Sequence, residues 1–357
     1  MHGGIDTKII KIDRKNIDPA ALKLCADTVK RGGLVCFPTE TVYGLGANAF
    51  DASAVSRIFE AKGRPGDNPL IVHISDYEML PGISHCDAGQ KDRLTRLGNA
   101  YWPGPVTMIV PKNEAIPDTV TCGLSTVGIR MPSHPVARKL IECAGVPIAA
   151  PSANLSGKPS PSQASHVIED LMGRVDIIID GGDCSVGVES TVLDISREEP
   201  LILRPGAITL DDVQKVLGSG TASDWHIELK EGETPRSPGM KYTHYAPKAR
   251  VILYDGDFLS VREAIRKETE KYIAEGKKTG IMTTDENLSY YDGLPNVLSL
   301  CGREDAAHQA ANLFKLLRQF DELGAEIVLS ETVPPEGVGD AVMNRLFRAA
   351  GGRSIRI

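Results

Sequence analysis

Short apolar segments alternate with helix-like stretches along most of the chain, and this alternation limits the fold class more than any other feature. Brief apolar runs bounded by turn residues and separated by helical periodicity are typical of buried strands in an α/β protein. The first part of the chain contains such runs at residues 34–37, 70–74, 106–110, 127–131, 146–150, 175–180, 191–195 and 201–203. We therefore expect an N-terminal α/β domain with a mixed sheet over residues 1–217.

The alternation is interrupted between residues 218 and 247 and then resumes. The interruption contains Gly-Ser-Gly-Thr and several prolines, a composition typical of a linker. Beyond it the chain again alternates apolar runs with helical stretches, at 251–254, 259–275, 279–283, 297–300, 305–323 and 327–329. Because strands that alternate with helices predict a parallel sheet, we expect a smaller, Rossmann-like C-terminal α/β domain over residues 248–357. A chain of 357 residues also suits two domains.

The second half of this linker contains more functional side chains than a spacer requires. It runs from Ser237 to Pro247 and includes Lys241, Tyr242 and His244. One interpretation is a lid that closes over a ligand pocket, with these three residues as its contacts, and the other is an exposed spacer. The sequence leaves both interpretations open.

Charge and composition exclude several classes of function. The net charge of −7 and the pI near 5.7 argue against broad nucleic-acid binding, so any RNA contact would be local. No apolar run approaches the ~20 residues that span a bilayer, which predicts no membrane association. The N-terminus lacks the features of a secretory signal, and the seven scattered cysteines include no CxxC pair. We therefore expect a cytoplasmic protein with reduced thiols.

A polar loop precedes the apolar run at 70–74. A helix from Asp51, its N-cap, to Lys62 would deliver Lys62 and Arg64 to this proline-flanked loop. Two cations on a stiff loop suit phosphate binding, although a solvated helix end would contain the same residues. If they bind phosphate, replacing either should abolish turnover and leave the melting temperature nearly unchanged.

A second polar loop follows the apolar run at 146–150 and contains Ser152, Asn154 and Ser160. These side chains suit either a ligand or the cap of a following helix. Because polar loops adjoin apolar strands at several places, we expect them to share an open ligand crevice.

Four further polar residues adjoin apolar strands, and each has two interpretations. His73 is a ligand or a hydrogen-bonded core histidine, and Arg130 binds a carboxylate or forms an ordinary salt bridge. Ser190 and Arg204 contact a ligand or stabilise turns.

Standard catalytic motifs are absent from the sequence. Gly44-Leu45-Gly46-Ala47-Asn48-Ala49 matches the relaxed dinucleotide fingerprint, but six residues separate it from the preceding strand, so we interpret it as a structural turn. The chain contains no GxxxxGK[ST], HExxH, GxSxG or EF-hand pattern, and its histidines lack metal-ligand spacing. We expect neither an enzyme nucleophile nor a metal bound by the protein.

Several ordered sequence blocks carry a family resemblance. They are Pro38–Gly46, Lys62-x-Arg64, Trp102–Pro105, Ser152-x-Asn154, Gly187–Thr191, Leu203–Gly206 and Ser237–Tyr242. Together they cover nearly the whole chain and resemble the YrdC-like threonylcarbamoyl-AMP synthase family in its long two-domain form. Lys241 and Thr243 stand where many relatives carry arginine, a departure that affects only the expected linker contacts.

The resemblance implies an L-threonylcarbamoyladenylate synthase, a nucleotidyltransferase that joins L-threonine, bicarbonate or CO2, and ATP into threonylcarbamoyl-AMP and releases pyrophosphate. Mg2+ would be bound to the ATP triphosphate with no ligand from the protein. The product would pass to a tRNA threonylcarbamoyl transferase complex for threonylcarbamoyladenosine modification of tRNA. Direct RNA binding is compatible with this role but is not required.

The resemblance also implies roles for individual residues. Lys62 and Arg64 would act in catalysis by offsetting charge on the α-phosphate and the leaving pyrophosphate. L-Threonine would be held by Thr41, His73, Arg130, the Ala150 backbone and Ser190. ATP would be held by Lys62, Arg64, Asn68, Thr126, Ser152, Asn154, Ser160 and Arg204.

Two rival interpretations belong to other classes. An RNA-binding regulator would use the first domain as a duplex platform, and the acidic net charge counts against it. An O-carbamoyltransferase of the hydrogenase-maturation type contains a related domain, but also CxxC zinc modules and an acylphosphatase region that this chain lacks. The synthase is therefore the expected function.

Overall fold

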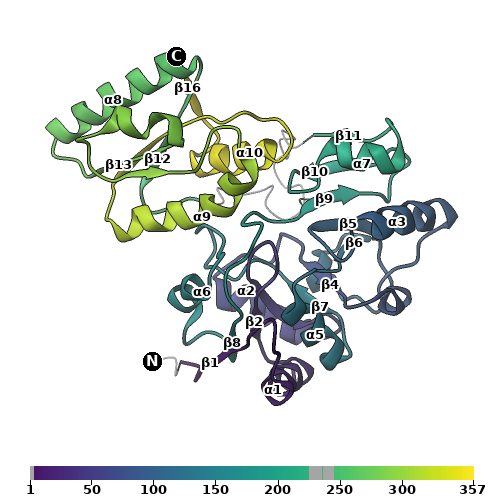
Figure 1. Ribbon diagram of the computed structural model, residues 1–357. Coiled ribbons are helices and arrows are strands. Elements are labelled where there is room, and N and C mark those ends of the chain that lie inside the picture. Colours follow the sequence, from purple (N-terminus) through teal and green to yellow (C-terminus); the bar gives the residue numbers. More distant parts are fainter. Residues whose placement is uncertain (1–3, 225–234, 236–244) are drawn as a thin grey trace. The chain divides into compact units, whose positions relative to one another are not determined.

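The computed structural model describes residues 4–224, 235 and 245–357, which form two compact units (Figure 1). Among these residues, unit 1 comprises 4–156, 161–185, 189–224 and 235, and unit 2 comprises 157–160, 186–188 and 245–357. Two short segments that lie between parts of unit 1 in the sequence, 157–160 and 186–188, thus belong to unit 2. Much of the predicted linker lies outside the described residues, so the predicted domain boundaries stay predictions.

Unit 1, as far as it is described, is built on an eleven-stranded sheet. In spatial order the strands are β1 (Lys8–Lys11), β8 (Ile177–Asp180), β2 (Val35–Phe37), β3 (Gly44–Asn48), β7 (Ile148–Ala150), β4 (Ile71–His73), β6 (Thr126–Arg130), β5 (Val106–Pro111), β9 (Thr191–Asp194), β10 (Leu201–Arg204) and β11 (Ala222–Ser223). Neighbours are parallel in the pairs β1–β8, β8–β2, β4–β6, β5–β9 and β10–β11, and antiparallel in the others. The prediction of a mixed-sheet α/β domain is confirmed.

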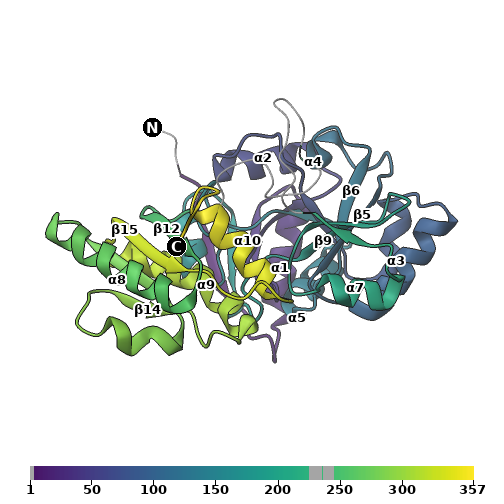
Figure 2. The same ribbon diagram turned by 90° about the horizontal axis from the view of Figure 1, so that it is seen from above.

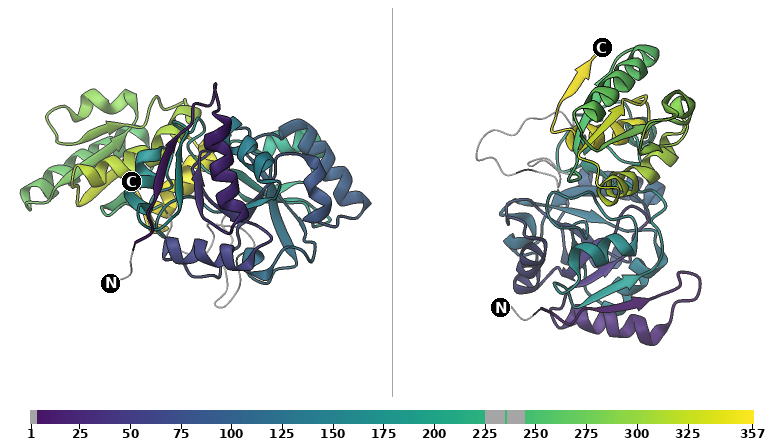
Figure 3. Two further views of the ribbon diagram at one scale, coloured as in Figure 1. Left: turned by 90° about the horizontal axis from the view of Figure 1, so that it is seen from below. Right: turned by 90° about the vertical axis from the view of Figure 1, so that its left-hand side faces the viewer.

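Helices cover both faces of this sheet. Successive strand residues point to opposite faces of the sheet. Val35 and Phe37 therefore pack in one buried cluster with α1 (Pro19–Lys30) and α5 (Pro135–Ala144), whereas Cys36 packs in a second cluster on the opposite face. Figure 3 (left) shows α1, in purple, against the sheet. The cluster that contains Cys36 draws on α2 (Ala52–Lys62), α3 (Ala88–Tyr101), α6 (Ala164–Leu171) and α7 (Leu210–Leu217). Of these, α3 and α7 lie side by side (Figure 2). Two short elements complete the helices, α4 (Asp118–Thr121) and the 3-10 helix η1 (Tyr77–Gly82).

The helix that leads to the first polar loop forms as predicted. The Asp51 side chain caps α2 by accepting from the backbone N–H groups of Ser53 and Ala54, at 2.9 and 3.1 Å. Gly63 ends the helix in the left-handed conformation, at φ 60°, which favours glycine. The helix therefore ends at Lys62 and turns the chain directly into the loop.

The glycine-rich segment at 44–48 is a strand, so its interpretation as a structural turn is wrong. It forms β3, which is antiparallel to both β2 and β7. A Cβ on Gly46 would lie 2.7 Å from Phe37 Cε1 and from Ile148 Cγ2, so the neighbouring strands leave no room for a side chain. The glycines here serve close packing, which the composition alone does not distinguish from a turn.

Unit 2 contains a five-stranded sheet in which every described pairing is parallel. Its strands, in spatial order, are β14 (Val297–Ser299), β13 (Thr279–Thr283), β15 (Ile327–Glu331), β12 (Arg250–Asp255) and β16 (Ser354–Arg356). The helical elements are α8 (Phe258–Ala274), the 3-10 helix η2 (Asp285–Tyr291), α9 (Ala306–Glu322) and α10 (Gly339–Ala349). The edge strand β16, yellow in Figure 3 (right), carries the C-terminus. The predicted smaller parallel-sheet domain is confirmed, with α10 and β16 as additional elements.

None of the helices in the described part of the chain has the length and apolarity needed to cross a bilayer.

Candidate functional site

Two neighbouring strands of unit 1 run in opposite directions, and this brings the two polar loops together. Strands β4 and β7 are antiparallel, with Ile71 opposite Ala150. The loop before β4 and the loop after β7 therefore lie at the same end of these strands, which we call the Ala150 end. The predicted ligand residues on the two loops are Lys62, Arg64, Asn68, Ser152 and Asn154.

Lys62, the last residue of α2, reaches across to the second loop. Its side chain is buried, and Nζ donates to the carbonyl oxygens of Ser152 and Asn154, at 2.5 Å each. Nζ also lies 3.5 Å from Asn154 Oδ1, which accepts from the Ser152 hydroxyl at 2.5 Å. The alternative of a solvated helix end is therefore wrong for Lys62. Its ammonium joins the two loops, whereas its role toward phosphate stays a prediction.

Arg64 and Asn68 lie on the same loop and contact each other. Arg64 Nη2 donates to the Asn68 carbonyl oxygen at 2.8 Å, and the guanidinium carbon lies 5.7 Å from the centre of the Phe59 ring. The Asn68 side chain is fully buried, yet neither Oδ1 nor Nδ2 has a hydrogen-bond partner among the described residues. Because an unpaired buried polar group costs about 1–3 kcal/mol, this amide is suited to bind a group from outside the protein.

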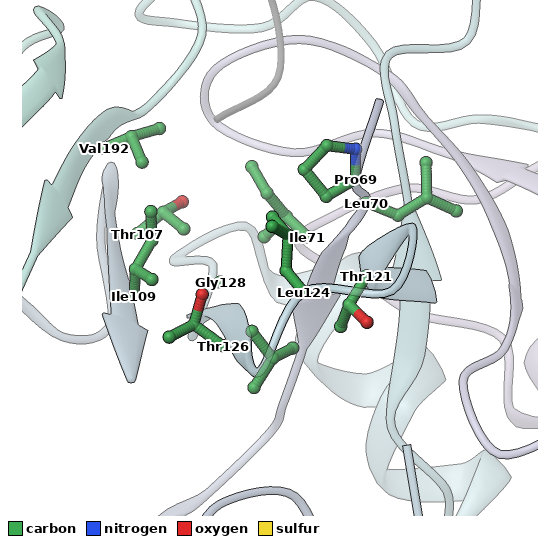
Figure 4. A pocket seen from close by; sticks show the side chains of 11 residues that line it. Pro69, Leu70, Ile71, Thr107, Ile109, Thr121, Leu124, Thr126, Gly128 and Val192 are labelled. Atoms are coloured by element: carbon green, nitrogen blue, oxygen red, sulfur yellow. The ribbon is translucent and has the colours of Figure 1, made fainter. Parts of the chain in front are cut away.

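A small hollow, with room for about one water molecule, begins at Pro69, the residue after Asn68 (Figure 4). It is lined by Pro69, Leu70, Ile71, Thr107, Ile109, Thr121, Leu124, Thr126, Val127, Gly128 and Val192. Thr126, a predicted ATP residue, is therefore in the wall of a hollow that begins next to Asn68.

The other predicted residues of unit 1 lie near the opposite end of the strands, which we call the Arg130 end. The parallel strands β4 and β6 both finish there, with His73 and Arg130 as register partners. Strand β9 begins there after Ser190, and the antiparallel β10 ends there at Arg204. Because β4 has three residues and a strand rises ~3.3 Å per residue, only about 10 Å separates the two ends.

Arg130 is buried and contacts two residues of the 38–46 block. Its Nη1 donates to the Thr41 hydroxyl at 2.8 Å, and Nη2 lies 2.7 Å from Glu40 Oε1 in an ion pair without hydrogen-bond geometry. The other carboxylate oxygen of Glu40 accepts from the Ser133 N–H at 3.1 Å. Arg130 Nε has no hydrogen-bond partner in the described part of the chain. Nε and Nη2 share one edge of the guanidinium, so this edge retains donors for a carboxylate.

His73 is a buried, neutral histidine. Burial and the nearby Arg130 charge lower its pKa to about 3, although contacts with the carbonyls of Ile71 and Ile148 act in the opposite direction. Nδ1 lies 3.1 Å from the Ile71 carbonyl oxygen, and the ring meets Phe37 edge-on at 6.0 Å. Both interpretations, a core histidine and a ligand contact, remain compatible with this environment.

Ser190 and Arg204 contact each other, so two residues predicted to hold different substrates are adjacent. Arg204 Nη2 donates to the Ser190 hydroxyl at 3.2 Å, and Nε donates to the Ser190 carbonyl at 3.1 Å. The Ser190 hydroxyl also lies 2.8 Å from Thr107 Oγ1. Arg204 therefore orients Ser190 through two bonds.

The remaining predicted residues fall elsewhere. Ala150 is the last residue of β7 and lies at the Ala150 end of the strands. Ser160 is buried and belongs to the segment 157–160 of unit 2. Lys241, Tyr242 and His244 lie outside the described residues, so the lid stays a prediction.

Sequence reasoning missed three polar residues near the predicted ones. Glu40 lies within the Pro38–Gly46 block, and a carboxylate between two threonines was an available signal. His134 is buried beside Glu40 with neither ring nitrogen hydrogen-bonded in the described residues, and burial lowers its pKa to about 4. Thr107 gave no signal, because it lies inside an apolar run and meets Ser190 only through the pairing of β5 with β9.

The described residues contain one trio with ligand atoms close enough to hold a cation, Cys301, Asp305 and His308 in unit 2. Asp305 is the N-cap of α9, and its carboxylate lies 2.7 Å from His308 Nδ1. Helix capping accounts for this contact.

Two family models together span most of the chain. The first, with the description "Telomere recombination" and the name Sua5/YciO/YrdC, matches residues 27–206. The second, described as "Threonylcarbamoyl-AMP synthase, C-terminal domain", matches residues 208–351. The chain belongs to the Sua5/YciO/YrdC family. The resemblance expected from the sequence blocks is confirmed, including the two-domain form.

Full-length members of the Sua5/YciO/YrdC family are similar to this chain. The Pyrococcus abyssi protein named threonylcarbamoyl-AMP synthase is 45% identical over 98% of this chain and 100% of its own length. The Bacillus subtilis protein of the same name is 44% identical over 96% and 97%. The crystal structure of P. abyssi Sua5 complexed with L-threonine has a TM-score of 0.91 at 44% identity, and covers 98% of this chain and 99% of that one.

Proposed function

We propose that this protein is an L-threonylcarbamoyladenylate synthase, a nucleotidyltransferase that converts L-threonine, bicarbonate or CO2, and ATP to threonylcarbamoyl-AMP and pyrophosphate. The buried Arg130 edge with an unpaired Nε carries the proposal, because a guanidinium in this state suits the carboxylate of an amino acid. Similar chains are named threonylcarbamoyl-AMP synthase, and one was solved with L-threonine.

The proposed reaction has two steps and requires no enzyme nucleophile. The threonine amine attacks the carbon of CO2, forms an N–C bond and loses a proton, which yields a carbamate. If bicarbonate supplies the carbon, one water is released as well. A carbamate oxygen then attacks the α-phosphorus of ATP, and the bond between that phosphorus and the bridging oxygen breaks to release pyrophosphate. Positioning and charge neutralisation are therefore the main demands on the protein.

The Arg130 end offers the groups that L-threonine requires. Arg130 would bind the carboxylate, with Thr41 already hydrogen-bonded to its Nη1 and Ser190 nearby in the sheet order. The Glu40 carboxylate beside Arg130 would supply an acceptor for the amine. His73, neutral at physiological pH, would add no positive charge against the amine. The Ala150 backbone would complete the threonine site.

The Ala150 end offers groups for ATP. Asn68, whose buried amide has no hydrogen-bond partner among the described residues, and Thr126 would contact ATP. Arg64 would neutralise phosphate charge, with Ser152 and Asn154 as further contacts at this end. Ser160 of unit 2 and Arg204 of the Arg130 end would also contact ATP. Lys62 would act through the loop that it holds, in addition to its charge. Mg2+ would arrive bound to the triphosphate, because the buried Glu40 carboxylate is engaged by Arg130 and Ser133.

The proposal includes a cellular role. The adenylate would pass to a tRNA threonylcarbamoyl transferase complex in the cytoplasm. The rival role, an RNA-binding regulator, has the net charge of −7 against it.

Pyrophosphate release from purified protein tests the proposal. The protein is incubated with MgATP and bicarbonate, and each of the common amino acids is added in turn. We expect release that depends on L-threonine and on bicarbonate. Release without an amino acid, or equal release with alanine, serine and valine, would contradict the proposal.

A further inference from the structure

The segment 157–160 belongs to unit 2, although the residues on both sides of it belong to unit 1. It reads Gly157-Lys158-Pro159-Ser160 and includes Ser160, which the proposed function assigns to ATP. Pro159 and Ser160 are both buried. The contacts that hold this segment within unit 2 therefore bear on a residue of the proposed nucleotide site.

Helix α9 contacts the residue next to Ser160. Arg318, which is 4% exposed, donates from Nη2 to the Pro159 carbonyl oxygen at 2.6 Å. At the other end of the segment, the Ala246 N–H donates to the Gly157 carbonyl oxygen at 3.1 Å. The segment is thus hydrogen-bonded at its first residue and next to its last.

The local sequence transmits the Arg318 contact to Ser160. The Pro159 carbonyl and the Ser160 N–H belong to one planar peptide unit, so a bond to the first orients the second. Pro159 has a fixed φ, and Pro161 restricts Ser160 to extended conformations. Because these prolines restrict the backbone on both sides, the bond from Arg318 contributes directly to the orientation of the Ser160 backbone.

The same helix contacts two further segments of unit 2. A Cβ on Gly187 would lie 2.4 Å from Ala311 Cα, so the segment 186–188 packs directly on the α9 backbone. Phe314 stacks on Tyr245 with ring centres 5.2 Å apart, and Asp321 accepts from the Lys248 N–H at 2.7 Å. Helix α9 therefore gathers the segments 157–160 and 186–188 with the chain at 245–248.

We propose that Arg318 of α9 is the positioning residue for Ser160. This inference rests on the proposed function, because that function assigns Ser160 to ATP. It assigns to α9 the orientation of a residue that the proposed function places against ATP.

A double-mutant cycle tests the inference in the full-length protein. The variants are Arg318→Met, Ser160→Ala and the double variant, with Lys315→Met on the exposed face of α9 as the matched control. ATP and L-threonine affinities are measured by titration calorimetry. Loss of one hydrogen bond to a bound ligand predicts a Kd for ATP raised about tenfold in each single variant. We expect no further rise in the double variant, an unchanged Kd for L-threonine, and wild-type values for Lys315→Met.

Arg318→Lys separates positioning from packing, because lysine keeps a charged donor. Arg318→Lys should recover part of the lost ATP affinity. If Arg318→Met does not fold, Arg318→Lys replaces it in the double-mutant cycle. An unchanged Kd for ATP in Arg318→Met would overturn the inference. So would multiplicative losses in the double variant, or equal losses of ATP and L-threonine affinity. Failure of the proposed function would be visible separately, as a wild-type protein without threonine-dependent pyrophosphate release.

Discussion

Replacing Lys62 with methionine should destabilise unit 1 as well as impair turnover. The Lys62 ammonium is buried and donates to the carbonyl oxygens of Ser152 and Asn154, at 2.5 Å each. Methionine keeps the aliphatic volume but leaves these carbonyls without that donor. Sequence reasoning expected a nearly unchanged melting temperature, and the buried environment of the ammonium contradicts that expectation.

The magnitude follows from the lost contacts. A hydrogen bond to a charged group contributes roughly 1.5–3 kcal/mol. The substitution removes two such bonds, but it also removes a buried charge, and this offsets part of the loss. We therefore expect the free energy of unfolding to fall by about 2–4 kcal/mol. For a domain of this size that corresponds to a melting temperature lower by about 5–15 °C.

Urea unfolding followed by circular dichroism measures this loss, and titration with ATP measures affinity in the same preparation. Lys139→Met is the matched control, because Lys139 is half exposed and forms its ion pair with Glu142 within α5. Its loss should stay within about 0.5 kcal/mol. If Lys62→Met matched this control in stability and still lost turnover, the ammonium would serve the nucleotide and not the loop.

Three other measurements check the site and the sheet. Arg130→Lys removes one donor of the guanidinium edge. In calorimetry it should raise the Kd for L-threonine about 10- to 100-fold and leave the Kd for ATP unchanged. An unchanged Kd for L-threonine would contradict the proposed carboxylate contact. His73 and His134 have folded pKa values of about 3 and about 4, below the 6.5 of an unfolded histidine, so the folded state binds fewer protons. Their stabilising contribution is complete above pH 6.5 and is lost as the pH falls toward 4, by up to about 1.4 kcal/mol per pH unit for each. We therefore expect the free energy of unfolding, measured in urea between pH 7 and 4, to depend less on pH in His134→Gln than in the wild-type protein. An identical pH dependence in the two proteins would contradict this expectation. Gly46→Ala should cost about 1–3 kcal/mol of unfolding free energy, because its Cβ would meet Phe37 and Ile148 at 2.7 Å, and a neutral effect would show that β3 can shift.

Local features of the sequence predicted the elements of this fold well. The apolar runs at 106–110 and 191–195 became β5 and β9, and Asp51 caps α2 as expected. These features depend on hydrophobic burial and on hydrogen bonds within a few residues, which a single sequence displays directly. The sequence predicted a turn at Gly44–Asn48, where the structure has a strand. A glycine in a crowded strand and a glycine in a turn cannot be distinguished by composition alone.

The candidate site was predictable only in part. The residue types on the two loops indicated a polar ligand, but whether Lys62 faced solvent or protein could not be read from its helix. Glu40 and Thr107 were missed because their partners, Arg130 and Ser190, lie 90 and 83 residues away along the chain. Contacts of that kind require the strand order.

The alternation of apolar and helical segments was enough to establish a two-domain α/β chain, and ordered motif blocks were enough to indicate its family. Strand direction was not encoded locally. The antiparallel pairing of β4 with β7 places Lys62 beside Ser152, and the parallel pairing of β4 with β6 places His73 opposite Arg130. Pro159, in the segment 157–160 of unit 2, likewise accepts a hydrogen bond from Arg318, 159 residues away along the chain. Such pairings follow from burying both faces of a sheet at once, a condition that many distant residues satisfy jointly and no short segment contains.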